Sequence, residues 1–389
     1  MIGLLAWAHF LNDGAANYLP GILPALLAAL ALPLRDAGIL VGFLIAFQAL
    51  QPFAGILADR SNARVMITLG LAGSSLGAAW IGWASNAQAL IGALVVIGIC
   101  NTLFHPPALT GVRRLAAGSG ENATAVFLVG GEVGRGLWPL LAGIVVTAWG
   151  LHALWVLALA AIPTLPLLWS RVPVRMHPAA RTGAWRGIRE AGQPLRMVIV
   201  YSALRATQIT GVSAFVPLLW EARGGKLVAG AGLITTMLVT GIIGNLGAAA
   251  LARHWGRRPL VIVNTAAFTV LLAVFLLASG IWLWITMALL GIAVFATLSL
   301  TVLMCQDQLP RNPSLGSGLA LGFSNALGAG LVAALGLLAP LWGPEGVLWT
   351  FVVCGAPAFL FAFALPADAP PPTTHHSPPT TATQSLSSS

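Results

Sequence analysis

Charged side chains are scarce in this chain of 389 residues. Asp, Glu, Lys and Arg together make up 7% of it, whereas hydrophobic residues make up 58% and the mean hydropathy is +0.90. A soluble domain carries about 25% charged residues. Because this chain could not cover a water-facing surface, its composition predicts an integral membrane protein.

Several functional classes are excluded by what the sequence lacks. The three cysteines, Cys100, Cys305 and Cys354, lie in apolar runs without a CxxC pair, so neither a disulfide framework nor a cysteine metal site is expected. The HExxH and GxSxG motifs and paired metal carboxylates are also missing, which argues against an intramembrane enzyme. The net charge of +9 is scattered between apolar runs, so nucleic acid is not expected as a partner. We expect no cofactor and no metal.

The spacing of the charges predicts twelve membrane-spanning helices. A span needs about 20 apolar residues, and charges therefore mark the loops. Three charged landmarks in the first half recur 194 positions later: they are Asp59, Arg64 and Arg113, repeated as Arg253, Arg258 and Asp307. We expect an all-α protein with six-helix bundles at residues 1–170 and 196–366, joined by a connector at residues 171–195. The tail at residues 367–389 is rich in Pro, Thr and Ser and is expected to be disordered.

The positions of Lys and Arg predict the orientation. Loops after even-numbered helices hold fourteen of these residues, and loops after odd-numbered helices hold three. Because positively charged loops stay in the cytoplasm, we expect a multi-pass protein of the inner (cell) membrane with both termini cytoplasmic. The first span carries His9, Asn12 and Asp13 and lacks a basic n-region, so it is not expected to be a cleaved signal peptide.

Ionisable residues inside spans are the candidate functional residues, because each costs a few kcal/mol at mid-membrane. His9, Asp13 and Asn17 recur at i, i+4 and i+8 on one face of the first helix. Burial favours the neutral form of a carboxylic acid, which is what a proton carrier needs. We therefore interpret Asp13 as a proton carrier and His9 and Asn17 as substrate contacts. A structural role, with Asp13 held by neighbouring donors, is the alternative.

The fourth helix carries Asn101 and His105 on one face, followed by Pro106-Pro107, which loosens the helical hydrogen bonds. Imidazole changes protonation near neutral pH, so we assign His105 to proton coupling and Asn101 to the substrate. A neutral histidine bonded to a carbonyl in a kinked helix fits equally well.

The fifth helix places Glu132 and Arg135 at i and i+3, where they can neutralise each other. A buried pair is a poor source of stability compared with apolar packing, and Arg presents a permanently charged planar fork to anions. We predict that Glu132 carries a proton and that Arg135 contacts the substrate. A self-contained ion pair is the alternative.

The seventh helix has Tyr201, Arg205 and Gln208 on one side. Arg205 has no acidic neighbour in sequence, so its partner must come from another helix, such as Asp13, or from a ligand. Two arginines within the spans predict an anionic substrate, with Arg205 and Gln208 among its contacts. The uncharged amides within the spans are expected to form interhelical hydrogen bonds; they are Gln48, Gln51, Asn245 and Asn325.

The loop after the second span carries a signature. Gly55-Ile-Leu-Ala-Asp59-Arg60-Ser-Asn-Ala-Arg64 resembles the GxxxDRxGR loop of the major facilitator superfamily, with Asn62 where Gly is usual. The resemblance implies a transporter that works by alternating access. It also implies that Gly55, Asp59, Arg60 and Arg64 form a cytoplasmic gate that holds the two halves together in the outward-open state.

Further segments are similar to those of the fosmidomycin resistance branch of this superfamily. They are His9-Phe-Leu-Asn12-Asp13, Gln51-Pro52, Phe104-His105-Pro106, Val129-Gly130-Gly131, Leu137-Trp138-Pro139-Leu140 and Gln308-Leu309-Pro310. The likeness implies a monomeric, proton-coupled drug exporter. Pro107 departs from the branch, which has Glu there, and Glu132 and Arg135 stand among residues that are usually uncharged. Fosmidomycin itself is therefore not implied as the substrate.

The sequence thus predicts proton-coupled export of a small anionic, drug-like compound or metabolite across a lipid bilayer. Its expected partners are this small molecule, protons and lipid. Uptake by symport remains an alternative because sequence does not fix direction. A membrane sensor or scaffold without flux is the alternative from another class.

Overall fold

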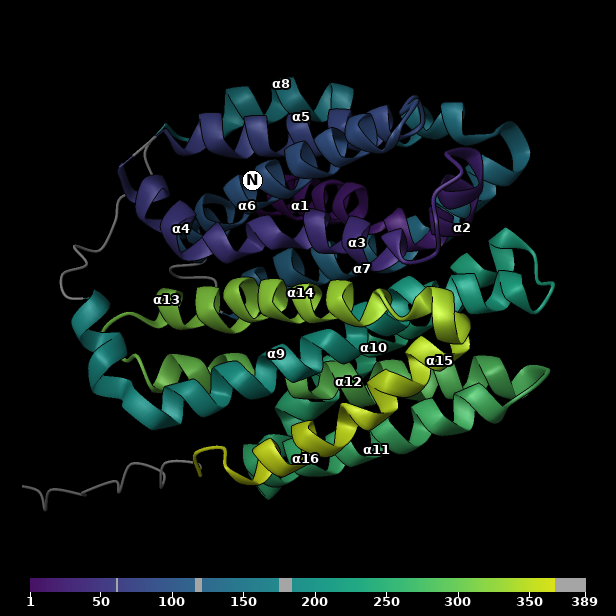
Figure 1. Ribbon diagram of the computed structural model, residues 1–389. Coiled ribbons are helices and arrows are strands. Elements are labelled where there is room, and N and C mark those ends of the chain that lie inside the picture. The colour runs from purple at the N-terminus through teal and green to yellow at the C-terminus, as the bar shows by residue number, and fades with distance from the viewer. Residues whose placement is uncertain (61, 116–120, 175–183, 368–389) are drawn as a thin grey trace, which may run out of the picture.

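The computed structural model describes residues 1–60, 62–115, 121–174 and 184–367, and their regular secondary structure is helical. Ten helical stretches among them are long and apolar enough to cross a membrane. Figure 1 shows the helices running side by side in two groups, α1 to α8 and α9 to α16. The predicted all-helical membrane fold is confirmed. The predicted tail from residue 368 onward and the connector residues 175–183 lie outside the described residues.

The first half of the chain contributes α1 to α8. Their bounds are α1 (Ile2–Asn17), α2 (Leu19–Ala29), α3 (Asp36–Ala46), η1 (Phe47–Leu50), α4 (Gln51–Arg60), α5 (Ala63–Ile81), α6 (Ala87–Leu115), α7 (Glu121–Trp149), η2 (Leu151–Ala158) and α8 (Ala161–Arg171). α1 and α2 together form the first predicted span. They are separated at Tyr18, two residues before Pro20, which has no backbone N–H to donate.

The second half contributes α9 to α16. Their bounds are α9 (Ala184–Ala222), α10 (Leu227–Trp255), α11 (Arg257–Leu277), α12 (Ile281–Asp307), α13 (Pro313–Ser317), η3 (Gly318–Phe323), α14 (Ser324–Gly336), α15 (Ala339–Val353) and α16 (Gly355–Phe363). α9 is broken at Gly192, whose φ of 54° is strained for other residues. The break separates the polar first part of α9 from the part that crosses the bundle.

Both halves repeat one arginine contact. Arg64, near the start of α5, donates from Nε to the carbonyl oxygen of Val172, 2.7 Å away and just beyond α8. Arg258, near the start of α11, donates to the carbonyl oxygen of Phe363 at the end of α16. A cation stabilises the free carbonyls at a helix C-terminus. The repeat seen in the charges therefore corresponds to a repeated contact between the third and last spans of each half.

The two halves pack through α3 with α14 and through α7 with α10, as Figure 1 shows. Gly38 of α3 lies so close to α14 that an added Cβ would be 2.8 Å from the carbonyl oxygen of Val332. Such small residues let membrane helices approach closely. Asn325 donates to Oε1 of Gln48 at 3.3 Å across this contact. These two amides therefore form the interhelical hydrogen bond expected of them.

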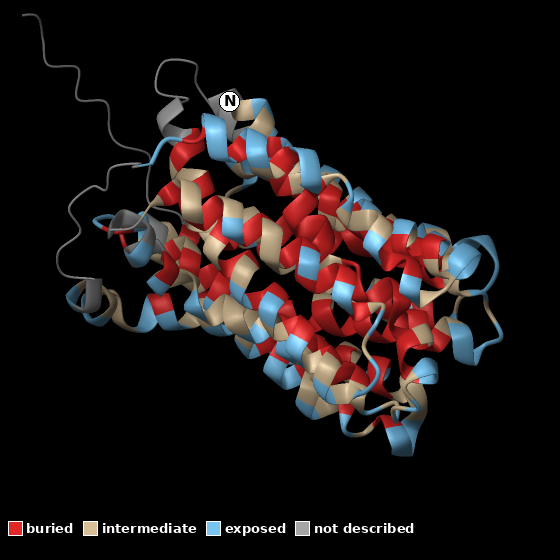
Figure 2. Cartoon of the chain, turned by 90° about the horizontal axis from the view of Figure 1, so that it is seen from above, coloured by how far each residue is buried: buried red, intermediate tan, exposed pale blue. Residues whose placement is uncertain are grey.

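The outer surface of the bundle is largely apolar. Buried residues gather between the helices in Figure 2, and large apolar side chains such as Leu76, Val270 and Leu277 are exposed on the outside. An aqueous protein rarely leaves so much apolar surface uncovered. Lipid chains would cover these side chains, in agreement with the membrane fold.

Candidate functional site

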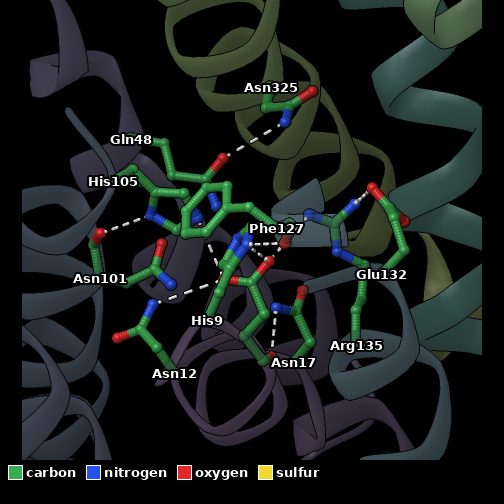
Figure 3. A network of polar contacts seen from close by, with 11 residues as sticks. His9, Asn12, Asn17, Gln48, Asn101, His105, Phe127, Glu132, Arg135 and Asn325 are labelled. Atoms are coloured by element: carbon green, nitrogen blue, oxygen red, sulfur yellow. Dashed lines mark hydrogen bonds and ion pairs between the residues drawn. The ribbon is translucent and has the colours of Figure 1, made fainter. Parts of the chain in front are cut away.

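Asp13 of α1 lies at the centre of a polar network in the first half, and its side chain is 1% exposed. His9 Nε2 is 3.3 Å from its Oδ2, His105 Nε2 is 3.1 Å from its Oδ1, and Arg135 Nη2 is 3.3 Å from its Oδ2. Figure 3 shows these three side chains pointing toward one another. Because His105 belongs to α6 and Arg135 to α7, the carboxylate joins three spans.

Glycines of α7 allow this helix to lie close to α1. Gly131 lies directly against the ring of His9, and Gly134 lies against the carbonyl oxygen of Phe10. A side chain at either position would overlap with α1. The glycine-rich run is therefore needed to bring the arginine of α7 to the carboxylate of α1.

Both histidines are oriented by backbone carbonyls. His9 Nδ1 is 2.8 Å from the oxygen of Phe127, and His105 Nδ1 is 2.8 Å from the oxygen of Asn101. Since a carbonyl oxygen only accepts hydrogen bonds, each Nδ1 must carry a hydrogen. In a neutral imidazole, Nε2 would then turn a lone pair toward the carboxylate of Asp13. Each Nε2···O contact is favourable only when a proton lies between the two atoms.

The network therefore has places for two labile protons, one at each contact between a histidine and Asp13. Without them, the carboxylates of Asp13 and Glu132 face the single positive charge of Arg135, which leaves a formal charge of −1. Adding both protons changes the formal charge to +1. This cluster can change its charge by exchanging protons, without any covalent chemistry.

Arg135 is shared between two acids. Its Nη2 contacts Asp13, and its Nη1 is 3.5 Å from Oε1 of Glu132. The side chains of Arg135 and Glu132 are 30% and 16% exposed. Exposed Leu137 and Ile144 mark the outer face of α7, and Arg135 lies on the opposite face because successive residues turn by about 100°. The exposed atoms of the ion pair therefore face the interior between the two halves.

Arg205 of α9 has a different environment. Its side chain is buried, and its Nε and Nη2 have no hydrogen-bond partner among the described residues; the same is true of Nε2 of Gln208 one turn later. Asp13, which the sequence offered as a partner for Arg205, pairs with Arg135 instead. Arg205 nevertheless interacts electrostatically with Arg135 and Glu132. The fold thus brings charged groups of the two halves within range of one another.

The remaining predicted substrate contacts lie in or beside the network. The residue His9, predicted to contact substrate, is 5% exposed; its ring stacks on Phe127 with centroids 4.2 Å apart and contacts Asp13. Asn17 donates to the backbone oxygen of Asp13 at 2.7 Å. Asn101 is buried and orients His105 through its carbonyl. The carbonyl of Phe127 was not anticipated, because every residue has one and sequence does not show where it points.

Arg64 is the one predicted gate residue whose side chain the structure describes. It contacts the backbone of Val172 and lies over the ring of Trp169, with 5.9 Å from its Cζ to the ring centroid. Both partners belong to its own half of the chain. Gly55, Asp59 and Arg60 lie outside the residues whose side chains are described.

His9, Asp13 and His105 also bring their side-chain nitrogen and oxygen atoms within 4.8 Å of one another, which is close enough to hold a metal ion. Arg135 already places a positive charge 3.3 Å from Oδ2 of Asp13. That charge opposes a second cation at the same oxygen. The arrangement suits exchangeable protons, and we assign no metal to it.

Known proteins resemble this chain over most of its length. The family model of the Major Facilitator Superfamily matches residues 5–333. The MFS-type transporter YfnC of Bacillus subtilis (strain 168) is 24% identical over 386 residues, covering 94% of this chain and 92% of YfnC. The fosmidomycin resistance protein of Escherichia coli (strain K12) is 23% identical over 354 residues, covering 87% of this chain and 86% of that protein.

Solved structures show the same fold. A mutant form of the nucleoside transporter NupG superposes with a TM-score of 0.78 at 12% identity, covering 93% of this chain and 98% of NupG. A bacterial homologue of the human lysosomal transporter Spinster, in an inward-facing and occupied conformation, has a TM-score of 0.77 at 16% identity, covering 93% and 95% of the two chains.

Proposed function

The chain belongs to the Major Facilitator Superfamily, and from this premise we propose that it couples the export of a small anionic, drug-like compound or metabolite to protons. It would work by alternating access as a monomer in the inner membrane, with both termini cytoplasmic. Its family and fold are those of transporters, not of enzymes. The gate residues Gly55, Asp59, Arg60 and Arg64 would close the cytoplasmic end in the outward-open state.

One observation carries the proposal: Asp13 is held by two histidines and an arginine inside the membrane, and Nε and Nη2 of a second arginine, Arg205, have no hydrogen-bond partner among the described residues. Charges in a bilayer interior are costly and are typical of substrate and ion pathways. The first group has the properties of a proton site, and the second has those of an anion site.

The two sites are coupled through Arg135. In the proton-free network, Asp13 and Glu132 both attract its guanidinium. Protons bound at His9, His105 and the carboxylates weaken this attraction, so Arg135 becomes free to contact an anion. When the protons leave, the ion pairs re-form and the anion loses one of its contacts. Proton movement is thereby converted into a change of anion affinity.

Export is supported by a relative that bears the name fosmidomycin resistance protein, since removing a compound from the cell confers resistance. The position of Arg135 between Asp13 and Glu132 favours uptake by symport as the second candidate. If protons release Arg135 for the anion, protons and anion strengthen each other's binding, and such linkage is reciprocal. That relation suits co-transport, whereas exchange requires that proton and substrate exclude each other.

The test starts from a thermal-shift screen of purified protein across anionic metabolites and antibiotics at two pH values, because a ligand stabilises the fold it binds. Flux of a hit is then measured in proteoliposomes under an imposed pH gradient of either sign. Opposite movement of hit and protons supports export by exchange, and movement in the same direction supports symport. If Asp13→Asn and Glu132→Gln both retain proton-coupled flux, the proton assignment is wrong. Stabilising ligands that never cross the membrane would instead support a sensor.

A further inference from the structure

Arg205 carries an unsatisfied pair of donors in the interior of the second half. The unpartnered atoms are Nε and Nη2, which lie on the same edge of the planar guanidinium. Nε2 of Gln208 is a third donor without an acceptor among the described residues. The two positions are i and i+3 on α9, so both side chains project from one helix face.

Among the described residues, no acid forms an ion pair with Arg205. Within the spans, Asp13 contacts His9, His105 and Arg135, and Glu132 contacts Arg135. The other described acids in ion pairs lie at helix ends with partners of their own; they are Asp36 with Arg35, Glu190 with Arg186, Asp307 with Arg257 and Glu345 with Arg223. A buried charge without a partner is unfavourable, and a permanently charged guanidinium cannot avoid the cost by losing its proton.

The neighbouring polar group on the same face is already satisfied. Tyr201, one turn before Arg205, bonds through its hydroxyl to Oγ1 of Thr265 on α11 at 2.7 Å. This hydrogen bond therefore anchors this part of α9 to α11. The fork of Arg205 has no comparable tie among the described residues, although it lies within electrostatic range of Glu132 and Arg135 in the first half.

We propose that Arg205 and Gln208 form the subsite for the acidic group of the substrate. The Nε and Nη2 edge of a guanidinium grips two oxygens of one group side by side, and Gln208 Nε2 supplies a third hydrogen bond. The ligand is therefore an oxyanion with two adjacent acceptor oxygens, such as a carboxylate or a phosphate-like group. This assignment rests on the proposed function. It implies that the second half binds the anion while the first half exchanges protons.

Two substitutions test the subsite in the purified full-length protein in detergent. Arg205→Lys keeps the positive charge and removes the fork. Gln208→Glu places a carboxylate three residues from Arg205, where it can occupy the fork in place of a ligand. The probes are benzoate and inorganic phosphate, with uncharged benzamide for comparison, and the readouts are calorimetric affinity and melting temperature. Arg223→Lys, at a helix end and paired with Glu345, is the matched control.

We expect benzoate or phosphate, but not benzamide, to stabilise the wild-type protein. Arg205→Lys should weaken that binding at least tenfold, and Arg223→Lys should leave it unchanged. Gln208→Glu should raise the melting temperature of the ligand-free protein and abolish the effect of the anion. The Gln208→Glu result separates a ligand subsite from a merely structural arginine, because a loss of packing would lower the melting temperature.

The proposal is overturned if neither anion raises the melting temperature of the wild-type protein, or if benzamide stabilises it as much as benzoate does. It is also overturned if both variants bind the anions with wild-type affinity. The anion-binding result does not depend on whether transport is coupled to protons. Anion binding lost in Arg205→Lys, together with proton-independent flux, would refute the proposed function and leave the subsite standing. Proton-coupled flux that is unaffected by Arg205→Lys would refute the subsite alone.

Discussion

Replacing Asp13 by Asn removes the charge at the centre of the network while keeping the shape of the side chain. The amide nitrogen can donate to the lone pair of a neutral His105 Nε2, and the amide oxygen can still accept from Arg135. The amide replaces those two contacts, but the contact with His9 loses its carboxylate and is not replaced. Since a hydrogen bond to a charged group contributes about 1.5–3 kcal/mol, we expect Asp13→Asn to lower the free energy of unfolding by about that amount.

Asp13→Ala is the sharper perturbation. It leaves Arg135 and both imidazoles without the acceptor that holds them, and removing one partner from a buried charged group costs about 3–5 kcal/mol. Asp36→Asn is the control, because Asp36 forms a more exposed pair with Arg35 at 3.8 Å and exposed pairs contribute at most about 1 kcal/mol. Equilibrium unfolding in detergent, followed by tryptophan fluorescence, measures the free energy of unfolding of the three variants and so ranks them.

The functional counterpart is measured in proteoliposomes with a pH-sensitive dye. Asp13→Asn keeps the hydrogen bonds to His105 and Arg135 without a carboxylate that can exchange protons, so proton movement driven by substrate should be lost although the protein remains folded. The reasoning fails if Asp13→Asn moves protons at the wild-type rate. It also fails if Asp13→Asn destabilises the protein as much as Asp13→Ala, because the amide would then not replace the carboxylate's hydrogen bonds.

Two further predictions concern packing and the repeat. Gly131→Ala should displace the ring of His9 and cost about 1–3 kcal/mol, together with loss of proton coupling; Gly247→Ala, with open space around it, should leave stability unchanged or raise it by up to about 1 kcal/mol. The same unfolding assay measures both. Arg64→Ala and Arg258→Ala should each cost about 1 kcal/mol by removing a helix-end contact, and the double variant should show additive losses because the sites lie in different halves. A strongly non-additive loss would contradict the independence of the two contacts.

The fold could be predicted because a bilayer restricts where charges can lie. The intervals between charged residues predicted the spans, and the repeat of Arg64 at Arg258 corresponds to a repeated contact in the structure. The break of the first span at Tyr18 was not predicted, although Pro20 was its local signal. Hydropathy sums over a window, and it does not register the loss of a single backbone donor.

Within the site, contacts along one helix were predictable and contacts between helices were not. The spacing of His9 and Asp13, and of Glu132 and Arg135, places each pair on one helix face, and the structure brings each pair together. The contact between Asp13 and Arg135 depends instead on how closely α1 approaches α7. That distance is set by glycines against backbone, and glycine in a span has too many roles to identify a particular neighbour.

The charges of the interior are distributed unevenly between the two halves. With neutral imidazoles, the network around Asp13 has a formal charge of −1, and Arg205 contributes +1 from the opposite half. The halves therefore attract each other across the interior when no proton is bound. Two protons make the network positive and reverse this attraction, until an anion on Arg205 compensates for it. The protonated, anion-free protein is thus the state in which approach of the two halves is least favourable, and under the proposed function this asymmetry would link proton binding to the movement of the halves.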